Sequence, residues 1–261
     1  MKRFIKPALR AFFPLVNGIL FDIPKHGKHP EKYDLKLRHQ KMDKLFYKVS
    51  KALDAEYIIL GKDNIPDGAI FYVCNHLSAS DPLVFKPVIN KTPVTFVSKI
   101  ENQKSKLLKN AVFAIDGLFM NRNDLRQSLK VMQKVEESLK EGNLSWCIYA
   151  EGTRALDSSS LMNDMHHGSF RPAIKAKVPI VPVASFGSNI ILKEKPIYKK
   201  YPIIFSFLKP IYPEEYEGMK TEEIAKLVQS RIQKEVSFKL RMIHHQEMLK
   251  QKKYRLHRLV S

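Results

Sequence analysis

Seven short apolar runs, separated by longer polar stretches, constrain the fold of this chain more than any other feature of its sequence. The runs are rich in β-branched and aromatic residues, and they span residues 57–60, 69–74, 94–98, 111–115, 144–150, 179–186 and 203–208. Runs that are apolar at nearly every position are typical of strands that are buried on both faces. The pattern therefore predicts a sheet that is covered on both sides.

Three of the polar stretches show helical periodicity, with apolar residues three or four positions apart. They predict helices over residues 36–53, 124–141 and 221–240, the last of which continues into a basic tail. In the second helix, Asp124 would cap the start and Gly142 the end. Its predicted apolar stripe consists of Leu125, Leu129, Met132, Val135 and Leu139.

The alternation of strands with helices predicts the fold class. We expect a single α/β domain with a largely parallel or mixed central sheet flanked by helices. N-terminal amphipathic helices and a basic C-terminal helix would extend this domain at its two ends.

The charge of the chain is large and lies mainly at its ends. The net charge is +19; residues 1–50 carry 12 Lys and Arg against 4 Asp and Glu, and residues 231–261 carry 9 against 2. Such ends suit anionic lipid or nucleic acid, because both present closely spaced phosphates. The sequence has no helix-turn-helix, zinc-finger or aromatic RNA-binding pattern, so a nucleic acid partner is not expected.

The first 22 residues combine four cations with an apolar stretch, as a signal peptide does. Pro14 and Asn17 interrupt that stretch, however, and no cleavage site follows it. We predict an amphipathic segment at a membrane surface, whose apolar side chains enter the acyl boundary. These side chains are Phe4, Ile5, Leu9, Phe12, Phe13 and Leu15. The alternative is a terminal helix packed on its own domain; a transmembrane helix is not predicted, because no run of about 18 uncharged apolar residues occurs.

Cysteine and histidine placement gives no indication of a metal site. Cys74 and Cys147 lie within apolar runs, which predicts buried, reduced thiols. The histidine pairs at 166–167 and 244–245 lack an evident third ligand. No metal is therefore expected.

The stretch "FYVCNHLSASDPLVF", residues 71–85, places His76 and Asp81 immediately after a predicted strand. Ligand sites in open α/β sheets gather where strands end at their carboxyl edge. A histidine there can accept a proton near neutral pH, and a carboxylate can orient its ring and stabilise the imidazolium. Two alternatives remain open: a hydrogen-bonded pair with a structural role, and a nucleophilic Ser78 or Ser80, although neither serine lies in a Gly-x-Ser-x-Gly turn.

Four sequence blocks resemble those of the glycerolipid acyltransferase family. "NHLSASD", residues 75–81, is similar to its Asn-His-x4-Asp motif, and "GLFMNR", residues 117–122, resembles its second block with a Phe-x-x-Arg core. "EGTR", residues 151–154, resembles the third block, and "VPIVPVA", residues 178–184, resembles the fourth, which would wall the pocket. The resemblance covers roughly residues 55–210, with the blocks in the family's order.

This resemblance implies a function and a set of site residues. The family transfers a fatty-acyl group from acyl-CoA or acyl carrier protein to the sn-2 hydroxyl of 1-acyl-glycerol-3-phosphate (lysophosphatidic acid), and needs no cofactor beyond that donor. His76 would be the catalytic base, oriented by Asp81. The implied substrate-binding residues are Asn75, Phe119, Arg122, Glu151, Gly152, Thr153 and Arg154. Arg122 and Arg154 would hold the acceptor phosphate, while Glu151 would pair with an arginine, or hold the loop or a glycerol hydroxyl.

The resemblance and the basic ends together imply an organisation of the chain. Residues 1–53 would form a basic membrane-associating segment, 54–215 the acyltransferase domain, and 216–261 a C-terminal helix and tail. The protein would lie peripherally on the cytoplasmic face of the cell membrane, in contact with the phospholipid surface.

Two positions depart from the family pattern. His167 stands where many members have a lysine before glycine, and Asp116 stands where many have glycine.

The acceptor could be glycerol-3-phosphate, another lysophospholipid or a lyso-aminolipid instead of lysophosphatidic acid. A non-enzymatic basic protein that binds phosphate or nucleic acid, or a catalytically idle membrane-binding protein, is a further alternative.

Overall fold

The protein is built around one mixed seven-stranded sheet. The computed structural model describes residues 16–89, 91–153, 162–191 and 200–260, with the side chains of 190 and 251–260 excluded. The strands are β1 (Ala55–Leu60), β2 (Phe71–Cys74), β3 (Val94–Lys99), β4 (Leu118–Met120), β5 (Ser145–Ile148), β6 (Ile180–Phe186) and β7 (Tyr201–Phe207). Their order in the sheet is β1-β7-β6-β2-β5-β3-β4. The predicted α/β fold with a mixed sheet is therefore confirmed.

The directions of the strands decide which loops meet. All neighbouring strands pair in parallel except β6 and β7, which are antiparallel. Consequently β6, β2, β5, β3 and β4 all end at the same edge of the sheet. The loops that follow these five strands lie along that edge, where α/β folds place their ligand sites.

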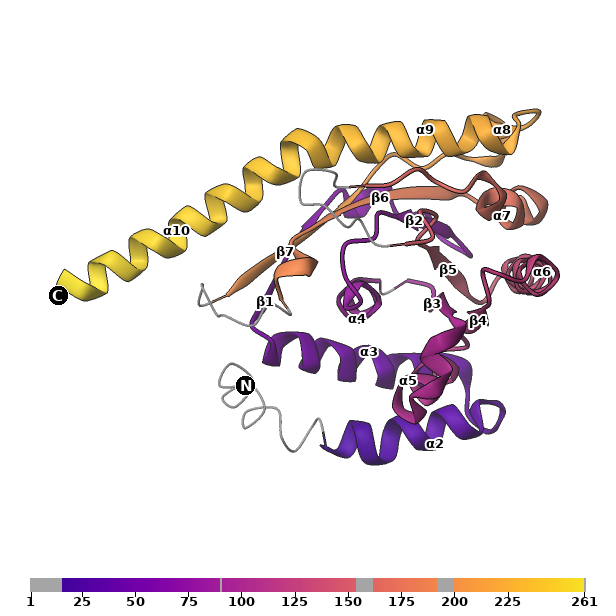
Figure 1. Cartoon of the computed structure of the whole chain (residues 1–261), viewed down its shortest axis with the longest axis horizontal. Helices are drawn as coiled ribbons and strands as arrows, with labels where there is room; N and C mark the ends of the chain where they lie inside the picture. Colours follow the sequence, from indigo (N-terminus) through magenta and orange to yellow (C-terminus); the bar gives the residue numbers. More distant parts are fainter. Residues whose placement is uncertain (1–15, 90, 154–161, 192–199, 261) are drawn as a thin grey trace.

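Helices cover both faces of the sheet (Figure 1). They are α2 (Ile23–Lys28), α3 (Leu35–Ala52), α4 (Asp81–Phe85), α5 (Lys106–Phe113), α6 (Leu125–Glu141), α7 (Arg171–Ala176), α8 (Pro213–Tyr216), α9 (Thr221–Lys234) and α10 (Arg241–Val260). Short helical segments at Gly18–Asp22 and Ile100–Lys104 precede α2 and α5, and a third, Glu235–Leu240, joins α9 to α10. The buried side chains of α6, α7 and α9 pack on one face, and those of α3 and α4 on the other.

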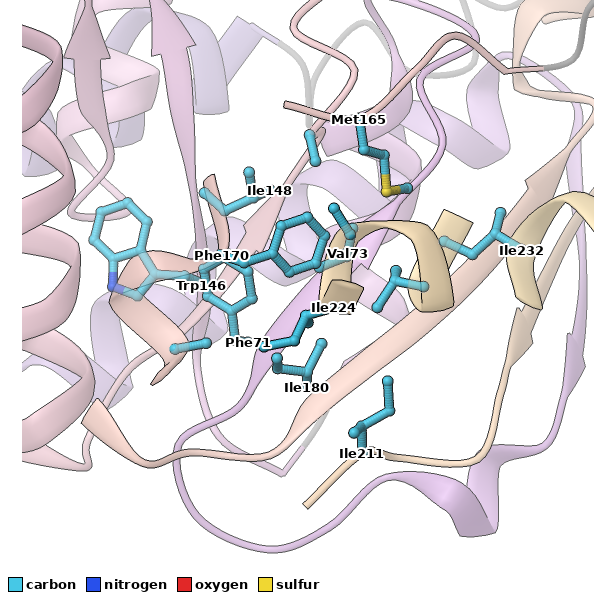
Figure 2. Close-up of a cluster of buried hydrophobic side chains, with 14 of the residues drawn as sticks. Phe71, Val73, Trp146, Ile148, Met165, Phe170, Ile180, Ile211, Ile224 and Ile232 are labelled. Atoms are coloured by element: carbon cyan, nitrogen blue, oxygen red, sulfur yellow. The ribbon is translucent and has the colours of Figure 1, made fainter. Parts of the chain in front are cut away.

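Successive side chains of the central strands point to opposite faces of the sheet and pack into two buried clusters, one on each face. Phe71 and Val73 of β2 belong to one buried cluster, shown in Figure 2 with Trp146 and Ile224, while Tyr72 and Cys74 belong to the other. Burial of each such side chain stabilises the fold by about 1.5 to 3 kcal/mol. Cys74 and Cys147 are buried and unpaired, as predicted, and burial raises the pKa of both thiols well above its ordinary value.

The three predicted helices are confirmed, with one error in how the second is buried. Asp124 caps α6 by accepting from the Gln127 N–H, and Gly142 ends it in the left-handed region at φ 79°. The predicted apolar stripe is wrong at its start, because Leu125 and Leu129 are 74% and 51% exposed. The helix turns Val131, Val135 and Leu139 toward the sheet instead.

The predicted strand at 111–115 is also wrong. These residues complete α5, whose start Ser105 caps by accepting from the Leu108 N–H, and the turn after it. The strand of this region is β4, further along the chain. A short apolar run cannot distinguish a strand from the end of a helix by periodicity alone.

Asp116, where the family often has glycine, lies in the turn before β4. Its φ is 55°, in the left-handed region that glycine adopts without strain. This conformation explains why a glycine suits the position. In this chain the Asp116 carboxylate instead receives two hydrogen bonds from Arg38 of α3.

The described part of the N-terminal region packs partly on the domain. Ile23 is buried, and Gly27 lies so close to α5 that a Cβ there would come within 2.1 Å of the Asn110 carbonyl oxygen. Ile19, Leu20 and Phe21 are exposed. The apolar residues predicted to enter a membrane, between 4 and 15, lie outside the described residues. Among the helices described, none is long and apolar enough to span a bilayer.

Candidate active site

His76 and Asp81 meet at the carboxyl end of β2. The His76 Nδ1 lies 2.8 Å from Asp81 Oδ2, which also accepts the backbone N–H groups of Leu77 at 2.8 Å and Ser78 at 3.0 Å. The His76 side chain is 17% exposed, whereas that of Asp81 is 2% exposed. Since a carboxylate only accepts, the Nδ1 of a neutral His76 carries the proton and Nε2 is the basic nitrogen. The pair thus has the geometry of an oriented general base.

Glu151 fixes the backbone of the same loop. It follows β5, the neighbour of β2, and its Oε1 accepts the His76 N–H at 2.7 Å. Its Oε2 accepts the Asn163 N–H at 2.6 Å. Burial raises the pKa of Glu151 to about 7, against the opposing effect of these two hydrogen bonds. The suggested loop-holding role agrees with this geometry, while pairing with an arginine stays a prediction; one candidate, Arg154, lies outside the described residues.

Replacing Glu151 by glutamine should lower kcat by roughly tenfold or more. The amide offers one acceptor oxygen, so one of the two backbone N–H groups would face an NH2 group and lose its partner. A buried donor left unsatisfied costs about 1 to 3 kcal/mol, and 1.36 kcal/mol is tenfold in rate when the loss falls on the transition state. Steady-state kinetics would measure this, with Glu137→Gln on the exposed face of α6 as the matched control.

The same variant should change the pH dependence of stability. Because the folded protein raises the Glu151 pKa above that of the unfolded chain, the stabilisation is present below about pH 4.5 and is lost as pH rises through 7. The melting temperature of the wild type, relative to Glu151→Gln, should therefore fall between pH 5 and pH 8. A difference that is constant across this range would show that Glu151 stays ionised in the folded protein.

Asn75 joins the ends of two strands. Its side chain is buried; Oδ1 accepts the Ser185 N–H at 2.7 Å, and Nδ2 donates to the Ser185 carbonyl at 3.1 Å. These bonds hold the residue before His76 to the end of β6. The geometry gives Asn75 a positioning role, and its contact with substrate stays a prediction.

The EGTR block begins in a tight turn after β5. Gly152 has a φ of 68°, in the left-handed region, so the backbone angle favours glycine; a Cβ there would lie 2.8 Å from the exposed His166 ring, which would have to move. Thr153 is exposed. His167, which replaces the family's lysine, lies 3.1 Å from Glu222, so its nearest charged partner is a carboxylate of α9.

Ser78 and Ser80 do not have the geometry of nucleophiles. Both side chains are buried, their hydroxyl oxygens lie 2.9 Å apart, and Ser80 donates to the Ser188 carbonyl at 3.3 Å. Within the described chain neither hydroxyl bonds to His76. Of the two alternatives left open by the sequence, the serine nucleophile is therefore not supported.

Arg122 lies at the same edge of the sheet but farther away. It follows β4, three strands from β2 in the order β2-β5-β3-β4, which is roughly 14 Å at the usual strand spacing. Hydrogen bonds from α6 hold its loop: Gln127 Oε1 accepts the Asn121 N–H, and Ser128 donates to the Asn121 carbonyl. Phe119 is buried, with its ring edge-on to that of Phe113. Contact of either residue with substrate stays a prediction.

Sequence reasoning missed Tyr149. Its ring stacks on the imidazole of His76, with centroids 4.4 Å apart. The available signal was an aromatic residue at the end of a strand, two positions before Glu151. Among the described residues, no group of three or more His, Cys, Asp or Glu side chains is arranged to hold a metal ion.

Comparison with known proteins agrees with the sequence blocks. The sequence model of the Acyltransferase family matches residues 57–185, which include His76, Asp81 and Glu151. The chain belongs to the acyltransferase family. The matched region contains β2, β5 and their loops, so the family assignment rests on the segment that forms this site.

Individual relatives extend the match along the chain. The acyltransferase is 28% identical over 229 residues to a Mycoplasma pneumoniae protein named probable 1-acyl-sn-glycerol-3-phosphate acyltransferase, covering 83% of this chain and 85% of that one. It is 29% identical to the protein of the same name from Mycoplasma genitalium, covering 78% and 79%. A crystal structure of the 1-acyl-sn-glycerophosphate acyltransferase PlsC from Thermotoga maritima matches 90% of this chain and 96% of that one, with a TM-score of 0.68 and 21% identity. This likeness shows that the two share a fold.

Proposed function

We infer that this chain is a 1-acyl-sn-glycerol-3-phosphate acyltransferase. It transfers a fatty-acyl group from a thioester of coenzyme A or acyl carrier protein to the sn-2 hydroxyl of lysophosphatidic acid, giving phosphatidic acid. The observation that carries this proposal is the His76–Asp81 pair, held by Glu151 at the carboxyl edge of the sheet of a member of the acyltransferase family. The names of its relatives support this choice of acceptor.

His76 carries the proposed chemistry. Its Nε2 removes the proton from the acceptor hydroxyl while the oxygen attacks the thioester carbonyl carbon, so a C–O bond forms and the C–S bond breaks. The imidazolium then returns the proton to the leaving thiolate. Asp81 keeps Nδ1 protonated and stabilises the imidazolium that forms, as a carboxylate does in hydrolase triads. This direct transfer needs no acyl-enzyme.

Two arginines are proposed to bind the acceptor phosphate. Arg122 is exposed, and within the described chain it makes no hydrogen bond or ion pair, so its donors are available for a bidentate contact. Arg154 is assigned to the same phosphate from the family's third block. A phosphate contact distinguishes this acceptor from a neutral alcohol.

The proposed substrate resides in a membrane, which gives a role to the basic ends of the chain. Lysine and arginine close to an anionic surface each contribute about 1 kcal/mol of binding. The exposed Ile19, Leu20 and Phe21 continue the apolar character of the preceding residues. We propose peripheral attachment of the full chain to the cytoplasmic face of the membrane, with residues 1–53 as the main contact and residues 54–215 as the catalytic part.

The test measures thiol release from an acyl thioester with lysophosphatidic acid presented in anionic vesicles. We expect release that depends on the acceptor, and sedimentation of the protein with the vesicles. Parallel assays with glycerol-3-phosphate, lysophosphatidylcholine and a lyso-aminolipid decide the acceptor, and parallel coenzyme A and carrier-protein thioesters decide the donor. Release without acceptor, or a preference for an acceptor that lacks a phosphomonoester, would contradict the proposal.

A further inference from the structure

Tyr149 lies beside the proposed base but has no part in the mechanism above. Its ring stacks on the His76 imidazole at 4.4 Å between centroids, with the two planes inclined by 28°. Phe96 of β3 stacks on the same tyrosine ring at 6.2 Å and 7°. Since β2, β5 and β3 are consecutive in the sheet, the three rings form one row across adjacent strands, with Tyr149 in the middle.

The hydroxyl of Tyr149 is not suited to proton transfer with a substrate. It is buried and has no oxygen or nitrogen partner among the described residues. Burial raises the pKa of Tyr149 well above its ordinary value, and the neighbouring Cys147 thiol adds to this effect. The phenol therefore stays neutral, and the part of the side chain that faces His76 is the ring.

We propose that Tyr149 is a positioning residue whose ring face holds the His76 imidazole and stabilises the imidazolium formed during acyl transfer. This inference rests on the proposed function. The negative face of an aromatic ring attracts a cation within about 6 Å of its centroid. The attraction to a neutral imidazole is weaker, so the contact favours the transition state over the ground state and acts on kcat.

The charged groups around His76 act in the same direction. Asp81 of α4 accepts from Nδ1, and Glu151 lies at the His76 backbone N–H. Both carboxylates favour the imidazolium when they are ionised. The ring of Tyr149 adds support perpendicular to the imidazole plane, a direction in which the in-plane hydrogen bond between Nδ1 and Asp81 does not restrain the ring.

Two substitutions distinguish the contribution of the aromatic ring of Tyr149 to activity from the contributions of its hydroxyl and of its packed volume. Tyr149→Phe keeps the face, whereas Tyr149→Leu removes it and keeps most of the apolar volume. We expect kcat within about twofold of wild type for the phenylalanine variant, and a fall of about 2- to 30-fold for the leucine variant. The KM values for donor and acceptor should not change, because Tyr149 is not proposed to touch either substrate.

A second measurement does not need turnover. NMR titration of the His76 ring in the full-length chain should show protonation at a pH lower by roughly 0.4 to 1.5 units in Tyr149→Leu than in Tyr149→Phe. If thiol release fails in the wild type but this difference is present, the proposed function is wrong and the stacking role stands. Tyr149→Met serves as a second variant without a ring if Tyr149→Leu does not fold.

Three results would overturn the inference. The first is equal kcat and equal His76 titration in the leucine and phenylalanine variants, which would mean that Tyr149 only fills space. The second is a phenylalanine variant as impaired as the leucine variant, which would assign the effect to the hydroxyl. An adverse change in KM alone would make Tyr149 a substrate-binding residue instead.

Discussion

Replacing His76 by alanine should lower kcat by about 10²- to 10⁴-fold and leave the fold intact. The loss is that expected for removal of a positioned general base. The fold should persist because Asp81 Oδ2 keeps its two backbone donors, Leu77 and Ser78, when the imidazole is gone. The measurement is acceptor-dependent thiol release, with the melting temperature as the check on folding.

Asp81→Asn tests the orienting part of the same pair. An amide oxygen can still accept the backbone N–H groups of the loop, but it does not stabilise an imidazolium as a carboxylate does. We therefore expect a fall in kcat that approaches that of His76→Ala and does not add to it in the double variant, because the two residues act as one unit. For the His76→Ala variant the matched control is His29→Ala, since His29 is an exposed histidine paired with Glu31. Retention of more than a tenth of the activity in His76→Ala would remove the general-base mechanism.

The sequence predicts this pair because all of its determinants are local. An apolar run ends at Cys74, polar residues follow at once, and Asp81 begins a short helix that turns the chain back toward His76. Six residues, 76–81, therefore contain the base, its orienting carboxylate and the turn between them. Periodicity and spacing are sufficient for a site of this kind.

The contacts that complete the site cross between strands, and no local pattern contains them. Glu151 bonds to a backbone N–H 75 residues earlier, and Tyr149 stacks on His76, only because β5 is adjacent to β2. Strand order does not follow from the sequence of apolar runs, which also gives no sign that β7 runs antiparallel to β6. The family resemblance assigned a role to Glu151, and the geometry gives that residue the backbone contact.

Burial on helices was predicted least well, for a physical reason. Periodicity locates an apolar stripe on α6 but not the direction in which the sheet lies, so Leu125 and Leu129 were wrongly placed in the core. On α3 the opposite occurs: Arg38 and His39 are polar, yet the structure buries both. They are buried because groups far along the chain satisfy their hydrogen bonds, and these partners are close only in the assembled fold.

That buried network leads to the largest expected effect on stability. Arg38 donates two hydrogen bonds to Asp116, at 2.8 and 3.0 Å, and a third to the Ala114 carbonyl at 2.9 Å. His39 Nε2 lies 3.0 Å from Asp116, and its Nδ1 lies 2.9 Å from the buried ammonium of Lys86. Burial lowers the pKa of His39 to about 4, against the opposing hydrogen bond to Asp116, so the ring is neutral near pH 7. The neutral ring then donates from Nε2 to the Asp116 carboxylate and accepts at Nδ1 from the Lys86 ammonium.

Asp116→Asn should lower the free energy of unfolding by about 2 to 4 kcal/mol. The substitution leaves the Arg38 guanidinium, which is almost entirely buried, without its counter-ion, and removing one partner of a buried pair is strongly destabilising. We place the value below that of a fully buried pair because the Asp116 side chain is 28% exposed. Urea unfolding measures the change, and Asp67→Asn, which breaks the exposed pair with Lys91, should have no measurable effect.

Asp116→Gly distinguishes two contributions of Asp116 to the free energy of unfolding, that of its ion pairs and that of its backbone conformation. Glycine adopts the φ of 55° without strain, and relief of a strained residue contributes of order 1 kcal/mol or more. If the ion pairs stabilise the fold as argued, the glycine variant should still be less stable than the wild type, though by less than the asparagine variant. A glycine variant more stable than the wild type would show that the carboxylate contributes less than the strain it imposes. In that case the Ala114 carbonyl and water would solvate Arg38 adequately, and the attachment of α3 to the loop before β4 would depend on that hydrogen bond and on apolar packing.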